Sequence, residues 1–279
     1  MKRRADVVIV GAGIAGVSAA YHLSVRLGIS DIVLVDPRPP LTLTSDKSTE
    51  CYRNWWPDAS MVGLMNRSID IYEELAEEVE FGFNRNGYLF VTGSDHQVDA
   101  WREDVEAVRP LGASADILEP ESLLSRYPFL TADAVGGLFV PRAGWFRAQD
   151  VGQWMLDRAR EAGTVVLAET VTNIDSEAVT LGDGTSISTD TTVVAAGPLS
   201  AKVAAMAGVD LPLFSELHLK VAFKDHLGLI PREAPMTIWS DIQTIDWSTE
   251  EREGLEELGR TDLLGEMPIF CHFRPEGGT

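Results

Sequence analysis

The sequence predicts an α/β fold in which a parallel sheet is interleaved with a second, α+β region whose sheet is mainly antiparallel. Three observations support this prediction. An apolar strand at 5–10 runs through a glycine-rich turn into a helical segment and a second apolar strand at 31–36. The apolar strands that resume the sheet follow only at 164–168 and at 191–196, after a long excursion. The excursion predicts a second domain threaded through the first.

The glycine-rich turn at 11–16 is typical of a dinucleotide-binding βαβ unit of the Rossmann type. Gly11 permits the tight turn, Gly13 lets backbone N–H groups approach a pyrophosphate, and Gly16 lets the helix pack close to the strand. The helix N-terminus carries the partial positive charge that a diphosphate favours. Asp36 ends the second strand, where it is expected to accept hydrogen bonds from ribose hydroxyls and to repel a 2′-phosphate. NAD or FAD is therefore favoured over NADP.

The spacing of apolar residues predicts the other elements. Helices are expected at 14–27, 58–79, 95–111 and 149–162, with a short helix from 119 and a loosely helical acidic insertion at 250–264. Further strands are expected at 88–91, 136–140 and 170–174, with a hairpin turn at 181–185. The strand at 191–196 is expected to be buried on both faces, as central parallel strands are. Residues 42–53 are predicted to form a loop. In residues 217–223, apolar and polar side chains alternate as they do in a half-exposed strand.

Composition narrows the classes of function. The chain has 279 residues and a formal net charge of −20, which disfavours binding to nucleic acid or to an anionic membrane. No segment is long and apolar enough to span a membrane, and Asp6 interrupts the apolar stretch that a signal peptide would need. Two cysteines far apart, Cys51 and Cys271, fit a reducing cytosol, and neither has metal-ligand spacing. A cytoplasmic protein without a metal site is predicted.

Four segments together resemble the D-amino-acid oxidase superfamily of FAD-dependent amine oxidoreductases, which includes glycine oxidase, sarcosine oxidase and dimethylglycine dehydrogenase. They are the βαβ unit at 6–36, the Ser/Thr-rich loop at 44–53, the segment at 143–148 before a helix, and the strand ending at 193–198. The resemblance spans nearly the whole chain. It implies a discontinuous FAD-binding domain at 1–80 and 145–212, and a substrate domain at 81–144 and 213–279. Members of the superfamily are typically longer, so the substrate domain is expected to be incomplete at its C-terminus.

The resemblance also implies which residues contact FAD. The loop after Asp36 would run along the diphosphate and flavin, the backbone at Val171 would read adenine, and the small residues Ala196 and Gly197 would let backbone pass close to the cofactor. The full expected set is Gly11, Gly13, Ile14, Ala15, Gly16, Asp36, Pro37, Ser45, Lys47, Ser48, Thr49, Val171, Ala196 and Gly197. Some relatives attach their flavin to a histidine where this chain has Cys51. Non-covalent FAD is nevertheless expected, because the loop can bind a diphosphate without a bond from that cysteine.

The expected reaction is oxidation of the C–N bond of a small amine, amino acid or N-methyl amino acid by hydride transfer to flavin. A cation should anchor any substrate carboxylate, and a histidine could tune protonation. The candidates are Arg53, His218 and Arg274, with Arg147 and His272 as further possibilities. Two alternatives stay open: a truncated or non-catalytic FAD-binding protein, and an NAD-dependent dehydrogenase. The sequence leaves the electron acceptor open.

Overall fold

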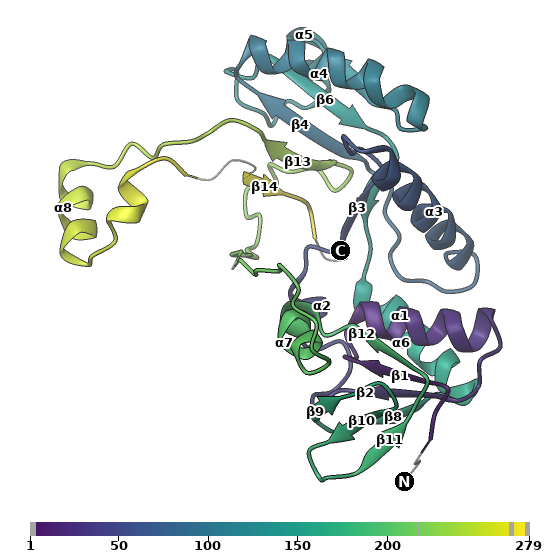
Figure 1. Cartoon of the computed structure of the whole chain (residues 1–279). Helices are drawn as coiled ribbons and strands as arrows, with labels where there is room; N and C mark the ends of the chain where they lie inside the picture. Colours follow the sequence, from purple (N-terminus) through teal and green to yellow (C-terminus); the bar gives the residue numbers. More distant parts are fainter. Residues whose placement is uncertain (1–3, 217, 268–270, 277–279) are drawn as a thin grey trace. The chain divides into compact units, whose positions relative to one another are not determined.

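The computed structural model describes residues 4–216, 218–267 and 271–276. The chain forms two compact units (Figure 1). Unit 1 comprises Met1–Glu50, Ala76–Gly82 and Phe146–Ala222, and unit 2 comprises Cys51–Leu75, Phe83–Trp145 and Phe223–Thr279. Each unit is thus assembled from three pieces of chain. Residues 51–75, placed with the FAD-binding domain in the sequence analysis, are part of unit 2.

Unit 1 is built on a four-stranded parallel sheet in the order β12-β1-β2-β8. The bounds are Val7–Val10 for β1, Ile32–Val35 for β2, Val165–Leu167 for β8 and Thr191–Val194 for β12. All four residues of β1 and of β2 are buried, as their unbroken Val, Ile and Leu composition predicts for strands covered on both faces.

Helices and a small antiparallel sheet complete unit 1. Helix α1 (Ile14–Tyr21) continues as a π-helical turn, η1 (His22–Arg26), and lies beside α6 (Ala148–Glu161), with the Tyr21 and Trp154 rings 5.5 Å apart. The antiparallel strands are β9 (Val171–Ile174), β10 (Ala178–Leu181) and β11 (Ser186–Ser188). Short helices are α2 (Thr44–Lys47), η3 (Gly197–Leu199) and α7 (Ser200–Ala205). The predicted helix at 149–162 and the hairpin turn at 181–185 are confirmed.

Unit 2 contains a mixed five-stranded sheet in the order β14-β13-β4-β6-β5. Among the described strands, β13 (Met236–Trp239) and β4 (Tyr88–Thr92) pair in parallel. Strands β5 (Asp116–Leu118), β6 (Gly136–Val140) and β14 (Cys271–Phe273) join the sheet antiparallel. A two-stranded antiparallel ribbon pairs β3 (Cys51–Arg53) with β7 (Ala143–Trp145). The mainly antiparallel sheet of the second region is confirmed.

The helices of unit 2 are α3 (Ala59–Leu75), α4 (Asp95–Val108), α5 (Pro120–Arg126) and α8 (Thr249–Glu257), with short turns η2 (Arg109–Leu111) and η4 (Thr261–Leu264). Helix α4 buries Val98, Trp101, Val105 and Val108, which recur at three- and four-residue steps. Helix α8 buries no residue, and its ordered start comes from a capping box between Ser248 and Glu251.

Three local predictions are wrong. Strand β12, which was predicted to be buried on both faces, lies at the edge of the sheet and is partly exposed. An apolar sequence indicates low polarity but does not say which strands will be its neighbours. The expected loop at 42–53 contains α2 and β3, which are too short to show a period. Residues 218–223 form no strand in the described chain, and residue 217 lies outside the described residues.

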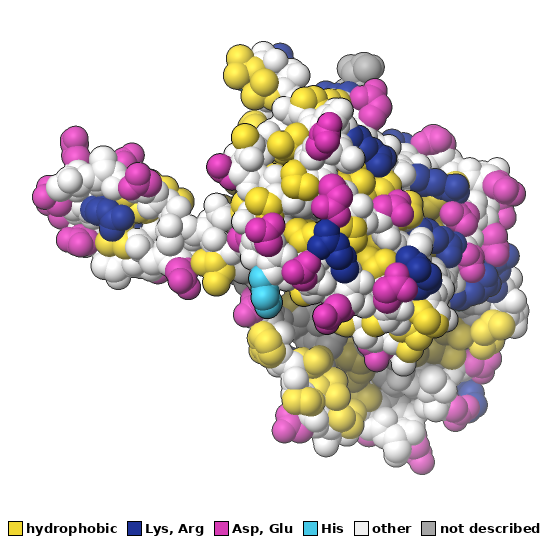
Figure 2. Space-filling view, turned by 90° about the horizontal axis from the view of Figure 1, so that it is seen from above, with side chains coloured by type: hydrophobic (Ala, Val, Ile, Leu, Met, Phe, Trp, Pro, Cys, Tyr) yellow, Lys and Arg dark blue, Asp and Glu magenta, His cyan; other side chains and the backbone are white. Residues whose placement is uncertain are grey.

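Charge is distributed over the surface in both signs. Figure 2 shows acidic side chains spread over the face in view, interspersed with Lys and Arg, and gathered on the segment around α8 at the left. No described helix has both the length and the apolar character that crossing a membrane requires.

Candidate cofactor site

The turn between β1 and α1 contains two glycines, Gly11 and Gly16, at which any side chain would force the neighbouring backbone to shift. Gly11 has a φ of +108°, and a Cβ there would lie 2.3 Å from the carbonyl oxygen of Ala195. A Cβ on Gly16 would lie 1.9 Å from the carbonyl oxygen of Gly11. These contacts bring the start of α1 against the ends of β1 and β12. The close helix packing predicted for Gly16 is therefore present.

The start of α1 is tied to the loop that follows Asp36. The Ile14 N–H donates to Ser45 Oγ at 2.9 Å, and Ser45 on α2 is itself buried. A Cβ on Gly13 would approach the same oxygen to 3.3 Å. Because the first N–H groups of a helix have no partner within it, this end of α1 presents donors and a partial positive charge. The hydroxyl hydrogen of Ser45 is an additional donor.

Asp36 is held at the end of β2 by two backbone donors. Its Oδ2 accepts from the Ala12 N–H at 2.9 Å, and its Oδ1 accepts from the Arg38 N–H at 2.9 Å. The side chain of Arg38 lies close as well, with Nε 4.0 Å from Oδ1. The carboxylate is thus fixed beside the glycine turn, and each oxygen retains a lone pair for a further donor.

A cavity of about 240 Å³ opens in unit 1 where these features meet. Ten of the fourteen residues predicted to contact the cofactor line it: Gly11, Gly13, Ile14, Ala15, Asp36, Pro37, Ser45, Val171, Ala196 and Gly197. The other four lie elsewhere. Gly16 packs behind the turn, Lys47 is exposed and pairs with Asp46, the Ser48 hydroxyl accepts from the Glu50 N–H at 3.0 Å, and Thr49 is half-buried.

Sequence reasoning missed several cavity residues. Arg38 and Lys202 bring positive charge to its wall, Glu169 brings an acid, and Leu199, Val203 and Met206 give an apolar side. Lys202 lies on α7, five residues after Gly197. Because Gly197 was itself a predicted cofactor contact, this closeness in sequence could have indicated Lys202 as a cavity residue. The glycine turn, the helix N-terminus, the fixed acid and the two cations together fit a dinucleotide.

The candidate substrate residues Arg53 and Arg274 both lie in unit 2. Arg53 is the last residue of β3, and Arg274 lies beside Trp145 of β7. The Arg53 guanidinium lies 4.2 Å from the Trp56 ring centroid and donates from Nε to the Trp55 carbonyl at 3.2 Å. The Arg274 guanidinium lies 5.3 Å from the ring of Trp145, and that side chain is only 8% exposed. In the described chain Arg274 pairs with Glu276 at 3.4 Å, whereas no carboxylate pairs with Arg53.

Tyr88 and Cys51 accompany Arg53. The Arg53 guanidinium lies 5.7 Å from the centroid of the Tyr88 ring, and both Arg53 and Cys51 act electrostatically on the Tyr88 phenol. Burial raises the pKa of Tyr88 well above its usual value, and Cys51 raises it further while Arg53 opposes the shift. Tyr88 therefore stays protonated beside the Arg53 guanidinium.

The remaining candidates have other surroundings. His218 belongs to unit 1, is 85% exposed, and lies 4.0 Å from Glu216. Arg147 pairs with Asp150 at 2.5 Å. His272 lies on the exposed edge strand β14.

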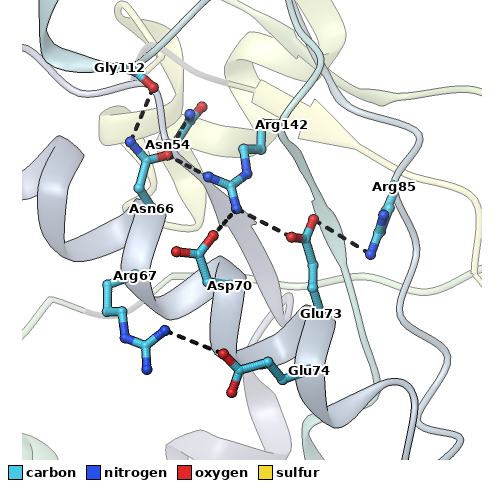
Figure 3. Close-up of polar contacts among 9 residues, drawn as sticks. All are labelled: Asn54, Asn66, Arg67, Asp70, Glu73, Glu74, Arg85, Gly112 and Arg142. Atoms are coloured by element: carbon cyan, nitrogen blue, oxygen red, sulfur yellow. Dashed lines mark hydrogen bonds and ion pairs between the residues drawn. The ribbon is translucent and has the colours of Figure 1, made fainter.

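A second polar cluster lies in unit 2 beside a hollow of about 290 Å³ (Figure 3). Arg142 donates to Asn66 Oδ1 at 2.9 Å and pairs with Asp70 at 2.5 Å and Glu73 at 3.3 Å. Arg85 pairs with the other oxygen of Glu73 at 3.5 Å. Because each cation already faces a carboxylate, this cluster acts as a clamp between α3 and the turn before β7.

Comparison with known proteins bears on the NAD-dependent alternative. The sequence matches the family described as FAD dependent oxidoreductase over residues 6–253. The chain belongs to this family. It is 28% identical over 269 residues to mitochondrial dimethylglycine dehydrogenase of Rattus norvegicus, covering 91% of this chain and 30% of that protein. It is 25% identical to sarcosine oxidase subunit beta of an Arthrobacter species, covering 84% of this chain and 64% of that protein.

The fold agrees with the family. The structure of L-proline dehydrogenase from P. horikoshii superimposes with a TM-score of 0.74 at 19% identity, over 95% of this chain and 78% of that one. The chain spans about 30% of the length of the dimethylglycine dehydrogenases that it matches. The family match sets aside the NAD-dependent alternative, because the family is FAD-dependent.

Proposed function

We propose that the protein oxidises the C–N bond of a small amine, amino acid or N-methyl amino acid, using FAD bound at the unit 1 cavity. The observation that carries the proposal is the convergence of the glycine turn, the start of α1 and the fixed Asp36 carboxylate on one cavity in a chain of this family. The similarity to dimethylglycine dehydrogenase and sarcosine oxidase subunit beta supports a small amine as substrate.

Each cavity residue has a role that its geometry supports. Asp36 would accept hydrogen bonds from ribose hydroxyls, while the first N–H groups of α1 and the Ser45 hydroxyl would donate to the diphosphate. Lys202 and Arg38 would offset the negative charge of the cofactor in a chain whose net charge is −20. We assign FAD binding to unit 1, and substrate binding to unit 2.

On the substrate side, Arg53 is the best-placed anchor for a carboxylate. Its guanidinium is oriented by the Trp56 ring and by Tyr88, and no described carboxylate competes for it. Arg274, which lies over the Trp145 ring, would add a second positive charge for the substrate carboxylate. His218 would transfer the proton. Bound FAD would supply the hydride acceptor. The amine must lose its proton first, because only the neutral nitrogen can donate its lone pair as the neighbouring C–H bond breaks.

Anaerobic bleaching of the flavin absorbance tests the reaction directly. Purified protein is mixed with dimethylglycine, sarcosine, glycine and L-proline in turn, and the visible flavin band is followed. We expect bleaching with at least one of them. A yellow protein that no amine bleaches would contradict the proposed activity and favour a FAD-binding protein without it.

The role of Arg53 is tested with substrates that differ only in the carboxylate. Arg53→Met should raise KM for an amino acid by about 10- to 100-fold, since a charge-assisted hydrogen bond contributes about 1.5–3 kcal/mol. The KM for the matching amine without a carboxylate should change little. Equal effects on both substrates would show that Arg53 acts on the fold of unit 2 and not on the carboxylate.

We further propose that FAD is held without a covalent bond. Cys51 is half-buried, and it acts electrostatically on the Tyr88 phenol. Acid precipitation should leave yellow flavin in the supernatant and a polypeptide of unmodified mass. A yellow pellet whose added FAD mass disappears in Cys51→Ala would show a thioether instead.

A further inference from the structure

Glu169 lies on the wall of the unit 1 cavity and has no role in the proposed function so far. It is half-buried and follows the last residue of β8 by two positions. Among the described residues its carboxylate has no hydrogen-bond or ion-pair partner, whereas Asp36, the other acid of the wall, accepts from two backbone N–H groups. A carboxylate in this state opposes an anionic dinucleotide unless part of the ligand donates a hydrogen bond to it.

The backbone on both sides of Glu169 is held in place. The carbonyl of Leu167, at the end of β8, accepts from the Asp36 N–H at 3.1 Å. On the other side, the Thr170 carbonyl accepts from the Gly182 N–H at 2.8 Å. These two hydrogen bonds fix the three-residue connection between β8 and β9. Glu169 therefore has a defined place at the cavity, next to the strand end that carries Asp36.

The polar groups of the cavity follow one another in the order of the strands. Strand β12 leads to Lys202 on α7, β1 leads to the glycine turn and α1, β2 ends beside Asp36, and β8 leads to Glu169. Because these strands are parallel, their carboxyl ends lie along one edge of the sheet, where α/β folds bind ligands. The edge thus passes from a cation and a helix N-terminus to two carboxylates.

A flavin adenine dinucleotide presents matching groups in the same order. The diphosphate suits the start of α1, and the hydroxyls of the adenosine ribose suit Asp36. The base continues past the ribose, away from the diphosphate, toward the end of β8. Val35 and Val171 are buried residues of the cavity lining and give the ring an apolar wall. Adenine carries an amino group at its 6-position, which donates hydrogen bonds.

We propose that the Glu169 carboxylate accepts a hydrogen bond from the adenine amino group of FAD and makes the cavity selective for adenine. A purine with a carbonyl oxygen at that position, such as hypoxanthine, would set lone pairs against the carboxylate and leave it unpaired. This inference rests on the proposed binding of FAD in unit 1 and adds the residue that distinguishes the base. Glu169 would act on the choice of cofactor and not on the oxidation of the amine.

The test compares FAD with its hypoxanthine analogue, in which a carbonyl oxygen replaces the adenine amino group. Apoprotein is titrated with each dinucleotide, and the quenching of flavin fluorescence gives the two dissociation constants. The parent protein should bind FAD about tenfold tighter than the analogue, or more, as expected for a charge-assisted hydrogen bond. Flavin, diphosphate and ribose are the same in both ligands, so the ratio of the constants reports on the base alone.

Two variants and a matched control assign the preference to the carboxylate. Glu169→Gln introduces an amide that can turn either its oxygen or its N–H groups toward the base, so it should bind the two dinucleotides within about threefold of each other. Glu169→Ala should bind FAD about tenfold more weakly than the parent and should also lose the preference. Glu177→Gln, at an exposed position between β9 and β10 outside the cavity lining, should keep the parent ratio.

Three outcomes would overturn the proposal. They are a parent protein that binds both dinucleotides equally, a Glu169→Gln variant that keeps the full preference for FAD, and a Glu169→Ala variant that loses affinity for both ligands by the same factor. The last would show that Glu169 acts on the shape or the charge of the cavity. All three leave the proposed FAD binding intact. A parent protein that binds neither dinucleotide would instead contradict the proposed function, and this inference with it.

Discussion

Ser45 Oγ accepts the N–H of Ile14 at 2.9 Å and so joins the loop after β2 to the first turn of α1. Ser45→Ala removes this acceptor and leaves a donor at the helix start unsatisfied, which costs about 1 kcal/mol. We expect a fivefold weaker affinity for FAD, measured by the quenching of flavin fluorescence. Ser48→Ala, at an exposed position of the same loop, is the control and should change affinity by less than twofold.

Asp36 anchors the glycine turn through Ala12 and is expected to bind the ribose as well. Asp36→Ala should weaken FAD by about ten- to a hundred-fold, because charge-assisted hydrogen bonds contribute about 1.5–3 kcal/mol. Titration of the apoprotein with FAD measures the change. A dissociation constant within threefold of the parent value would show that the carboxylate serves the turn alone.

Gly13 lies where backbone and cofactor should meet. Gly13→Val should give a folded protein that elutes without flavin, because the branched side chain would occupy the space beside Ser45. Flavin absorbance after gel filtration is the measurement. Gly63→Ala, in α3 with open space around its Cβ position, is the control and should retain flavin. Full flavin content in Gly13→Val would refute the assignment of the turn.

Arg142 and Arg67 form a matched pair in the cluster of Figure 3. Arg142 is one-third exposed and contacts Asn66, Asp70 and Glu73, whereas Arg67 is 63% exposed and pairs with Glu74 at 3.4 Å. Arg142→Ala should lower the free energy of unfolding by about 2 kcal/mol. Arg67→Ala should lower it by less than about 0.5 kcal/mol, since exposed pairs contribute little. Urea titration followed by circular dichroism compares them, and similar losses would contradict the clamp.

Buried tyrosines predict a loss of stability at alkaline pH. Burial raises the pKa of Tyr52, Tyr72 and Tyr88 above the usual value near 10. Their contribution to stability is complete below that pH and is lost as pH rises toward the raised values, because the unfolded chain ionises first. Tyrosinate absorbance from these residues should therefore appear only together with unfolding. Ionisation well before any loss of ellipticity would contradict their burial.

The sequence predicted the βαβ unit because its signals are local: an unbroken apolar strand, three spaced glycines and an acid at the next strand end. Ten predicted contacts line one cavity for the same reason. The order of the strands in the sheet could not be predicted in the same way, since the apolar content of β12 does not show that it lies at an edge. Lys202 was missed because its place at the cavity depends on how α7 leaves the sheet. The residues around Arg142 were not predicted, because the sequence does not show which polar side chains of α3 meet a cation that lies about 70 residues further along the chain.

Strand β1 pairs on one side with β2, which is close in sequence, and on the other with β12, where Val7 lies opposite Thr191. At ribosomal rates of about 5–20 residues per second, β12 follows β1 out of the ribosome only after roughly 10–40 s. During that interval a fully apolar Val-Val-Ile-Val strand has an unpaired edge. Newly made protein is therefore expected to need chaperone protection during synthesis, and refolding yield should fall with protein concentration.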